Sequence, residues 1–215
     1  MALLRASALP NVITIGRVIM APVVFVLIFM PGFTARIVAF VLFVLAAVSD
    51  LWDGYLARKH GWISDFGQLV DPIADKLLLV ATLIPFYVLS HRGGPVGPLP
   101  WWGELPWWVL GIIFGRELVV TILRSRSARR GLILPAGESG KQKAVFQNIF
   151  IGSVLFWYAL QSLAYTRAWS GFAWQSWQAF HAAVLNATLA IALFLTVYSF
   201  IIYVGRWRKV ALREP

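Results

Sequence analysis

Five aspartates, all of those in the chain, lie in the stretch SDLWDGYLARKHGWISDFGQLVDPIADK, between residues 49 and 76. Asp50 and Asp53 are spaced i,i+3, and Asp71 and Asp75 are spaced i,i+4, so each pair shares one face of a helix. Two such helices joined by a short loop can point four carboxylates into one pocket. Four anions near low dielectric repel each other unless a cation neutralises them, and oxygen-only ligands suit Mg²⁺, Mn²⁺ or Ca²⁺ rather than zinc. The spacing therefore predicts a pair of divalent metal ions.

The residues around these acids leave room for a ligand that carries phosphate. Gly54 and Ala57 on the first helix, with Gly67 in the connecting loop, allow a bulky group to approach the backbone. Arg58 offers a planar fork of donors for phosphate oxygens. We therefore expect a site for a metal-bound phosphate ester. The alternative is that the small residues serve only helix packing and that the acids cap helix ends.

The elements that position these residues are membrane helices. The chain is 60% hydrophobic and only 13% charged, with 11 Trp and no Cys, which is typical of a protein dissolved in lipid and excludes disulfides. Because a bilayer core takes ~20 apolar residues of helix, we expect an all-α integral membrane protein with six transmembrane helices. The expected spans are roughly 11–30, 36–57, 70–90, 106–125, 144–165 and 182–205. No repeat or linker divides residues 1–215, so we expect a single domain.

The basic residues indicate how these helices cross the membrane. The formal net charge of +10 could suggest nucleic acid in a soluble protein, but here the cations gather on one side of the expected topology. That side carries Arg58, Lys59, Arg124, Arg126, Arg129, Arg130, Lys141, Lys143, Arg206, Arg208, Lys209 and Arg213, whereas the other carries Arg36, Arg92 and Arg167. The positive-inside rule then places both termini in the cytoplasm. The aspartates would face the cytoplasm too, and we expect no nucleic-acid partner.

The aspartate pattern resembles, without a gap, the signature of the CDP-alcohol phosphatidyltransferase family. The matching residues are Asp50-x2-Asp53-Gly54-x2-Ala57-Arg58-x8-Gly67-x3-Asp71-x3-Asp75. The resemblance implies a membrane-embedded enzyme, usually a homodimer, that displaces CMP from a CDP-linked donor. It implies that the four aspartates hold Mg²⁺ or Mn²⁺ and, except for Asp75, also contact the CDP group. Gly54, Ala57, Arg58 and Gly67 would line the CDP pocket, and Asp75, last in the signature, would be the general base as well as a metal ligand.

Weaker features resemble the branch of this family that makes phosphatidylglycerophosphate. The opening LPNVITIGRVIMAP places Thr14 and Arg17 at matching positions, so both are possible site residues, and Arg17 should face the bundle rather than lipid. The segments DPIADK, GRELVVTILR and GKQKAVFQN also resemble that branch. The implied substrates are CDP-diacylglycerol and glycerol 3-phosphate, in a bacterial plasma membrane. Phosphatidylserine, phosphatidylinositol and cardiolipin synthases share the core signature and stay as alternatives.

The acceptor's phosphate requires cations that an uncharged acceptor would not need. Arg116 lies beside Glu117 in a largely apolar segment, where ionisable residues are costly and therefore candidates for function. Arg124 falls near the same helix face at i+8, and Lys141 and Lys143 return toward it from the next loop. These four cations are the predicted acceptor-phosphate site. The alternative for Arg116 is a structural ion pair with an aspartate or with Glu117.

A divalent-cation transporter is the rival from another functional class, because carboxylates in membrane helices also carry ions. A transport site should lie near the bilayer midplane. The acids here cluster at one end of their helices, beside arginines and lysines that would repel a permeating cation and attract phosphates. The charge pattern therefore favours phosphate binding.

Overall fold

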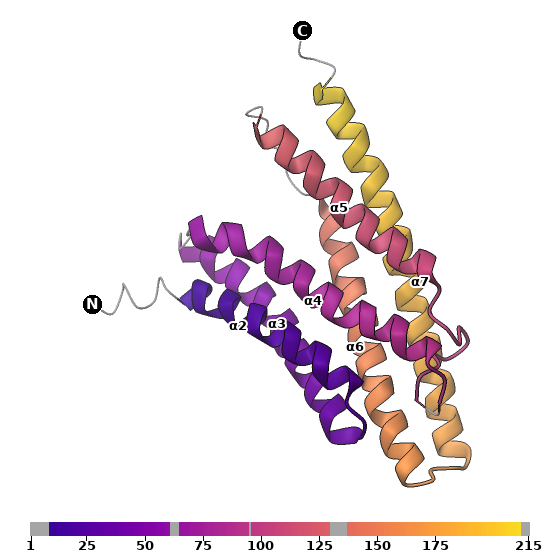
Figure 1. The fold of residues 1–215 in the computed structure, drawn as a ribbon. Coiled ribbons are helices and arrows are strands. Elements are labelled where there is room, and N and C mark those ends of the chain that lie inside the picture. Colours follow the sequence, from indigo (N-terminus) through magenta and orange to yellow (C-terminus); the bar gives the residue numbers. More distant parts are fainter. Residues whose placement is uncertain (1–8, 61–64, 95, 130–136, 212–215) are drawn as a thin grey trace.

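Figure 1 shows a computed structural model of the chain, which describes residues 9–60, 65–94, 96–129 and 137–211. Within these ranges the regular secondary structure is helical, apart from one isolated β-bridge between Leu99 and Gly103. The helices are α2 (Leu9–Phe29), α3 (Phe33–His60), α4 (Asp65–His91), α5 (Trp107–Arg129), α6 (Glu138–Thr166) and α7 (Phe172–Ala211). The all-α class expected from the sequence is confirmed for the described residues.

Five of these helices, α2, α3, α4, α6 and α7, are long and apolar enough to cross a membrane. They expose many large apolar side chains, such as Val41 at 47% and Phe194 at 67%, which suits an environment of lipid rather than water. The apolar stretch of α5 contains Arg116, Glu117 and Arg124, so length and composition alone do not mark it as a span. The helices indicate an integral membrane protein.

The helices pack as two groups that meet at α3 and α6. In the first group α2 packs against both α3 and α4, and in the second α7 packs against α5 and α6. Figure 1 shows the chain alternating in direction, so that the start of α2 and the end of α7 lie toward the same end of the bundle. The buried core includes Phe43 of α3, Phe86 of α4, and Phe150 and Tyr158 of α6.

The connection between α4 and α5 is packed against the far end of the bundle. A Cβ at Gly97 would lie 2.4 Å from the carbonyl oxygen of Leu89, so only glycine allows this close approach. The Tyr158 hydroxyl donates to the Gly97 carbonyl (3.2 Å), and Asn186 of α7 donates to the Pro100 carbonyl (3.3 Å). These contacts tie α4, α6 and α7 together at the end opposite Asp50.

Two helices extend further than the apolar pattern predicts, and the loop between them is shorter. The expected spans left the residues between 57 and 70 as a loop, but α3 continues to His60 and α4 begins at Asp65. Gly67 therefore lies in the first turn of α4 and not in a loop. Polar residues can continue a helix beyond the hydrocarbon, whereas a hydropathy pattern detects only the part inside it. The same reason explains the length of α7, whose 40 residues rise about 60 Å.

Candidate functional site

A buried arginine brings the aspartates of α3 and α4 together. Arg17 of α2 is only 2% exposed, as expected for a residue that faces the bundle. Its Nη1 contacts Asp50 and donates to Asp75 Oδ1 (2.9 Å), while its Nη2 donates to Asp71 Oδ1 (3.0 Å). Thr14, one turn earlier on α2, donates its hydroxyl to the same Asp71 oxygen (2.7 Å). We refer to Arg17, Asp50, Asp71 and Asp75 as the acidic cluster.

The acidic cluster suits a hard divalent cation in its chemistry. Three carboxylates from two helices converge on a single guanidinium, so the described members of the cluster keep a net negative charge. The atoms that could bind a metal ion here are all carboxylate oxygens, the ligands that Mg²⁺ and Mn²⁺ prefer. Among the described residues, no three acidic or histidine side chains are placed so that they could hold a metal ion together. The three carboxylates contact Arg17 instead. A bound ion would therefore have to share or replace the contacts of that guanidinium.

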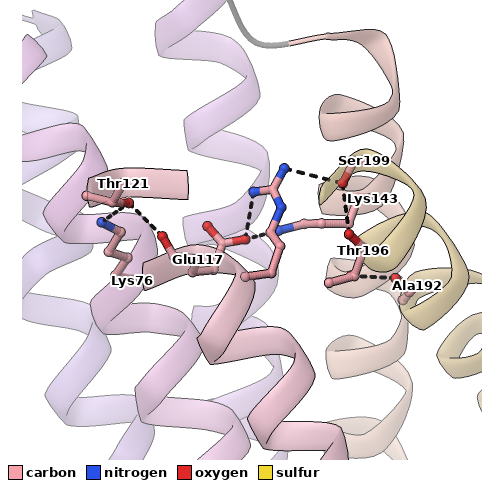
Figure 2. Close-up of polar contacts among 8 residues, drawn as sticks. Lys76, Glu117, Thr121, Lys143, Ala192, Thr196 and Ser199 are labelled. Atoms are coloured by element: carbon pink, nitrogen blue, oxygen red, sulfur yellow. Dashed lines mark hydrogen bonds and ion pairs between the residues drawn. The ribbon is translucent and has the colours of Figure 1, made fainter. Parts of the chain in front are cut away.

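A second ion cluster, of opposite sign, lies on α5 and α6. Glu117 Oε1 accepts from Arg116 Nη1 (3.1 Å) and contacts Lys143 Nζ, as Figure 2 shows for the lysine. Arg116 also donates to the Ser199 hydroxyl of α7 (3.3 Å). The alternative of an ion pair between Arg116 and Glu117 is therefore observed. We refer to Arg116, Glu117 and Lys143 as the basic cluster, because one carboxylate is shared by two cations.

Lys76 reaches from α4 to α5, beside the basic cluster. Its Nζ donates to the hydroxyl of Thr121 (2.7 Å), and that hydroxyl donates to the backbone carbonyl of Glu117 (2.7 Å) (Figure 2). Lys76 directly follows Asp75, so the two side chains leave α4 about 100° apart. Asp75 is turned toward α2 and Lys76 toward α5.

The two clusters face one cavity of about 330 Å³. Its charged lining residues are Arg17, Asp50, Asp75, Lys76, Arg116, Glu117, Arg124, Lys141 and Lys143, so it holds six cations and three acids. All four predicted acceptor-phosphate cations, Arg116, Arg124, Lys141 and Lys143, are brought to this cavity, together with two of the predicted metal ligands. An excess of positive charge next to the acidic cluster suits a ligand that carries several phosphates.

An apolar groove opens from the same cavity between α3 and α6. The groove has a volume of about 720 Å³, and it shares Phe43, Ala47, Asp50, Lys141, Ala144 and Asn148 with the cavity. Away from the shared residues it is lined by Phe40, Gly152, Phe156 and His181 among others. A molecule with a charged head and an apolar tail could therefore occupy both spaces at once.

Some predicted site residues fall outside what can be described. Helix α3 passes through Asp53, Gly54, Ala57 and Arg58, and α4 through Gly67, but the side chains of these positions lie outside the described residues. Sequence reasoning missed Lys76 and the central place of Glu117, and it named Thr14 and Arg17 only as possible site residues. A lysine directly after Asp75 in an apolar helix was the available signal for Lys76.

Comparisons with known proteins agree with this arrangement. The family model described as CDP-alcohol phosphatidyltransferase matches residues 7–204. The chain is 41% identical over 151 residues to a "Probable phosphatidylglycerophosphate synthase" of Mycobacterium tuberculosis, a match that covers 69% of this chain and 66% of that protein. It is thus similar to slightly under two thirds of the mycobacterial protein's length.

Two further relatives carry a related name. The "CDP-diacylglycerol--glycerol-3-phosphate 3-phosphatidyltransferase" of Rickettsia typhi is 34% identical over 147 residues, covering 68% of this chain and 75% of that protein. The "CDP-diacylglycerol--glycerol-3-phosphate 3-phosphatidyltransferase 2" of Arabidopsis thaliana is 32% identical over 155 residues, covering 70% of this chain and 65% of that protein. The family that the aspartate signature indicated, which is generally dependent on divalent metals, is thereby confirmed. This chain belongs to the CDP-alcohol phosphatidyltransferase family.

Proposed function

We propose that the chain transfers the phosphatidyl group of CDP-diacylglycerol to glycerol 3-phosphate, releasing CMP and forming phosphatidylglycerophosphate. The observation that carries this proposal is the cavity that has carboxylates on one wall and an excess of cations on the other. A diphosphate donor needs metal-holding acids, and an acceptor that brings its own phosphate needs cations. The names of the bacterial and plant relatives support the same pair of substrates.

The acidic cluster is the proposed donor side of the site. Asp50, Asp53, Asp71 and Asp75 would hold Mg²⁺ or Mn²⁺, as two ions, which when bound neutralise the diphosphate and favour the departure of CMP. Gly54, Ala57, Arg58 and Gly67 would line the CDP pocket. The apolar groove between α3 and α6 would receive an acyl chain of the donor, since it opens from the same cavity beside Asp50.

The acceptor would bind along the basic wall. Its hydroxyl oxygen attacks the phosphorus that carries the diacylglycerol, the bond from that phosphorus to the oxygen of CMP breaks, and CMP leaves with the electron pair. Asp75 lines the cavity and has a side chain that is 57% exposed, so it is placed to take the hydroxyl proton. Arg116, Arg124, Lys141 and Lys143 supply the positive field that holds the acceptor phosphate.

The proposed setting is a bacterial inner membrane, crossed by all six helices within a single domain of residues 1–215. Both termini and the cavity would face the cytoplasm, because the ends of α5 and α7 nearest the cavity carry the basic residues Arg126, Arg129, Arg208 and Lys209. The charged residues of α5 would then face the cavity and not lipid. A homodimer is proposed by analogy with the family.

A panel of acceptors tests this function. Purified protein with CDP-diacylglycerol and Mg²⁺ receives glycerol 3-phosphate, serine, inositol, inositol phosphate or phosphatidylglycerol, and CMP release is measured. We expect the highest kcat/KM with glycerol 3-phosphate. Serine or phosphatidylglycerol as the sole productive acceptor would assign the chain to another branch. Uptake of Mn²⁺ into sealed vesicles without any CDP-dependent product would favour the transporter instead.

A further inference from the structure

The cations of the cavity differ in how far their charge is already neutralised. Arg116 and Lys143 share the carboxylate of Glu117, and Lys141 pairs with Glu138 (2.9 Å). Lys76 has the Thr121 hydroxyl as its polar contact, and neither Lys76 nor Arg124 forms an ion pair with a described carboxylate. An anion that enters the cavity would therefore gain most from Lys76 and Arg124.

These two cations also lie on the same side of the cavity. Thr121, which holds the Lys76 ammonium, and Arg124 are spaced i,i+3 on α5, so they share one helix face. Helices α4 and α5 are not among the closely packed helix pairs in the described part of the chain, and both contribute residues to the lining of the cavity, so Lys76 bridges them at the cavity wall. A phosphate could contact Lys76 from the cavity without displacing a buried ion pair.

The position of Lys76 next to Asp75 matches the shape of the proposed acceptor. Glycerol 3-phosphate carries its attacking hydroxyl and its phosphate at opposite ends of a three-carbon chain. The cation that binds the phosphate should therefore lie close to the general base without pointing into the acidic cluster. Lys76 meets both conditions, because it is adjacent to Asp75 along α4 and its side chain turns to α5.

Building on the proposed function, we infer that Lys76 is the principal contact for the acceptor phosphate, which lies with Arg124 between α4 and α5. Thr121 positions the ammonium when no acceptor is bound. Arg116 and Lys143 act on the acceptor mainly through the positive field of the basic cluster. This moves the centre of the acceptor site from Arg116, where the sequence placed it, toward Lys76.

The decisive variant is Lys76→Gln, compared with wild type and with Arg126→Gln. Arg126 is an exposed cation on α5 that does not line the cavity, so it controls for a general loss of positive charge. Loss of a charge-assisted contact should raise the KM for glycerol 3-phosphate about 10- to 100-fold, with the KM for CDP-diacylglycerol changed less than about threefold. Inorganic phosphate should compete with the acceptor in wild type and much more weakly in Lys76→Gln. Arg126→Gln should leave both KM values unchanged.

Two more variants separate substrate binding from a structural bridge. Thr121→Val removes the hydroxyl and keeps the ammonium, so its acceptor KM should rise only a few-fold. If the acceptor KM of Thr121→Val rises as much as that of Lys76→Gln, and both variants have lowered thermal stability, the lysine is a structural bridge between helices. That result would overturn the inference. An unchanged acceptor KM in Lys76→Gln would also overturn it.

If Lys76→Gln does not fold, Lys76→Arg decides the matter. An acceptor KM shifted several-fold at constant donor KM would support the contact, whereas an unchanged KM or a second failure to fold would reject it. A wild-type protein that does not use glycerol 3-phosphate would refute the proposed function itself. Normal use of glycerol 3-phosphate by both wild type and Lys76→Gln would refute only the role of Lys76.

Discussion

The acidic and basic clusters are built in the same way with the charges reversed. In the acidic cluster one arginine, Arg17, is surrounded by three carboxylates, and in the basic cluster one carboxylate, Glu117, is shared by two cations. Each central residue reduces the repulsion among its neighbours without cancelling their charge. The remaining charge, negative on one wall and positive on the other, indicates which ligand each cluster still needs.

The two clusters differ in how exposed their members are. The three aspartates have side chains that are 41% to 57% exposed, whereas Arg116, Glu117 and Lys143 are 7% to 22% exposed. Half-exposed acids can share an incoming ion with Arg17, since water already solvates part of each carboxylate. The buried basic cluster would lose more on rearrangement, so we expect it to remain intact and to attract the acceptor as a preformed field.

The largest expected effect comes from removing one acid, in Asp71→Asn. The substitution keeps the size of the side chain but removes a charge that offsets the divalent ion. Because a bound metal contributes several kcal/mol of charge stabilisation, CMP release should fall about 10³-fold. Stability without metal should hold or rise, because repulsion within the acidic cluster decreases. Full turnover with unaltered Mg²⁺ dependence would remove Asp71 from the metal ligands.

Much of the acidic cluster could be predicted from local sequence, whereas the contacts of its central residue could not. The i,i+4 spacing places Asp71 and Asp75 on one helix face wherever the helix lies, and the structure brings both of them to Arg17. Arg17 is 33 residues from Asp50 and 58 residues from Asp75 in the chain. Its contacts depend on how α2 packs against α3 and α4. Hydrophobic periodicity does not determine this packing, because α2 carries apolar residues on all of its faces.

The basic wall was harder to predict for a related reason. The cations that the sequence places toward the end of α5 and the start of α6 predicted a phosphate site there. Which cations are free to bind a substrate depends on pairing across helices. Lys143 meets Glu117 from 26 residues away, and Lys76 meets Thr121 from 45 residues away. Spacing along one helix contains no information about such partners.

The second prediction removes the centre of the acidic cluster, in Arg17→Met. Methionine keeps much of the volume of arginine but leaves three carboxylates without their shared cation. Since the arginine is buried and the acids are half-exposed, the loss should lie between the values for surface and buried pairs, at about 2–3 kcal/mol. Thermal unfolding in detergent measures this change.

Added ligands show whether the charge of the acidic cluster is the cause. Mg²⁺ should restore the stability of Arg17→Met, because it replaces the missing positive charge, whereas inorganic phosphate should not. A variant that phosphate stabilises and Mg²⁺ does not would contradict the assignment of this wall to a cation.

The smallest effect is expected from Glu117→Gln, which removes the negative charge at the centre of the basic cluster, as Arg17→Met removes the positive charge at the centre of the acidic cluster. Glutamine keeps an oxygen that Arg116 and Lys143 can contact, so unfolding should become easier by only about 1–2 kcal/mol. The two cations would then have no carboxylate between them, and an added dianion should bind more tightly than in wild type. Inorganic phosphate or glycerol 3-phosphate should therefore raise the unfolding temperature of Glu117→Gln more than that of wild type, while Mg²⁺ should not. A variant that responds to Mg²⁺, or to neither ligand, would show that the two clusters are not counterparts and that Glu117 serves only to join α5 to α6.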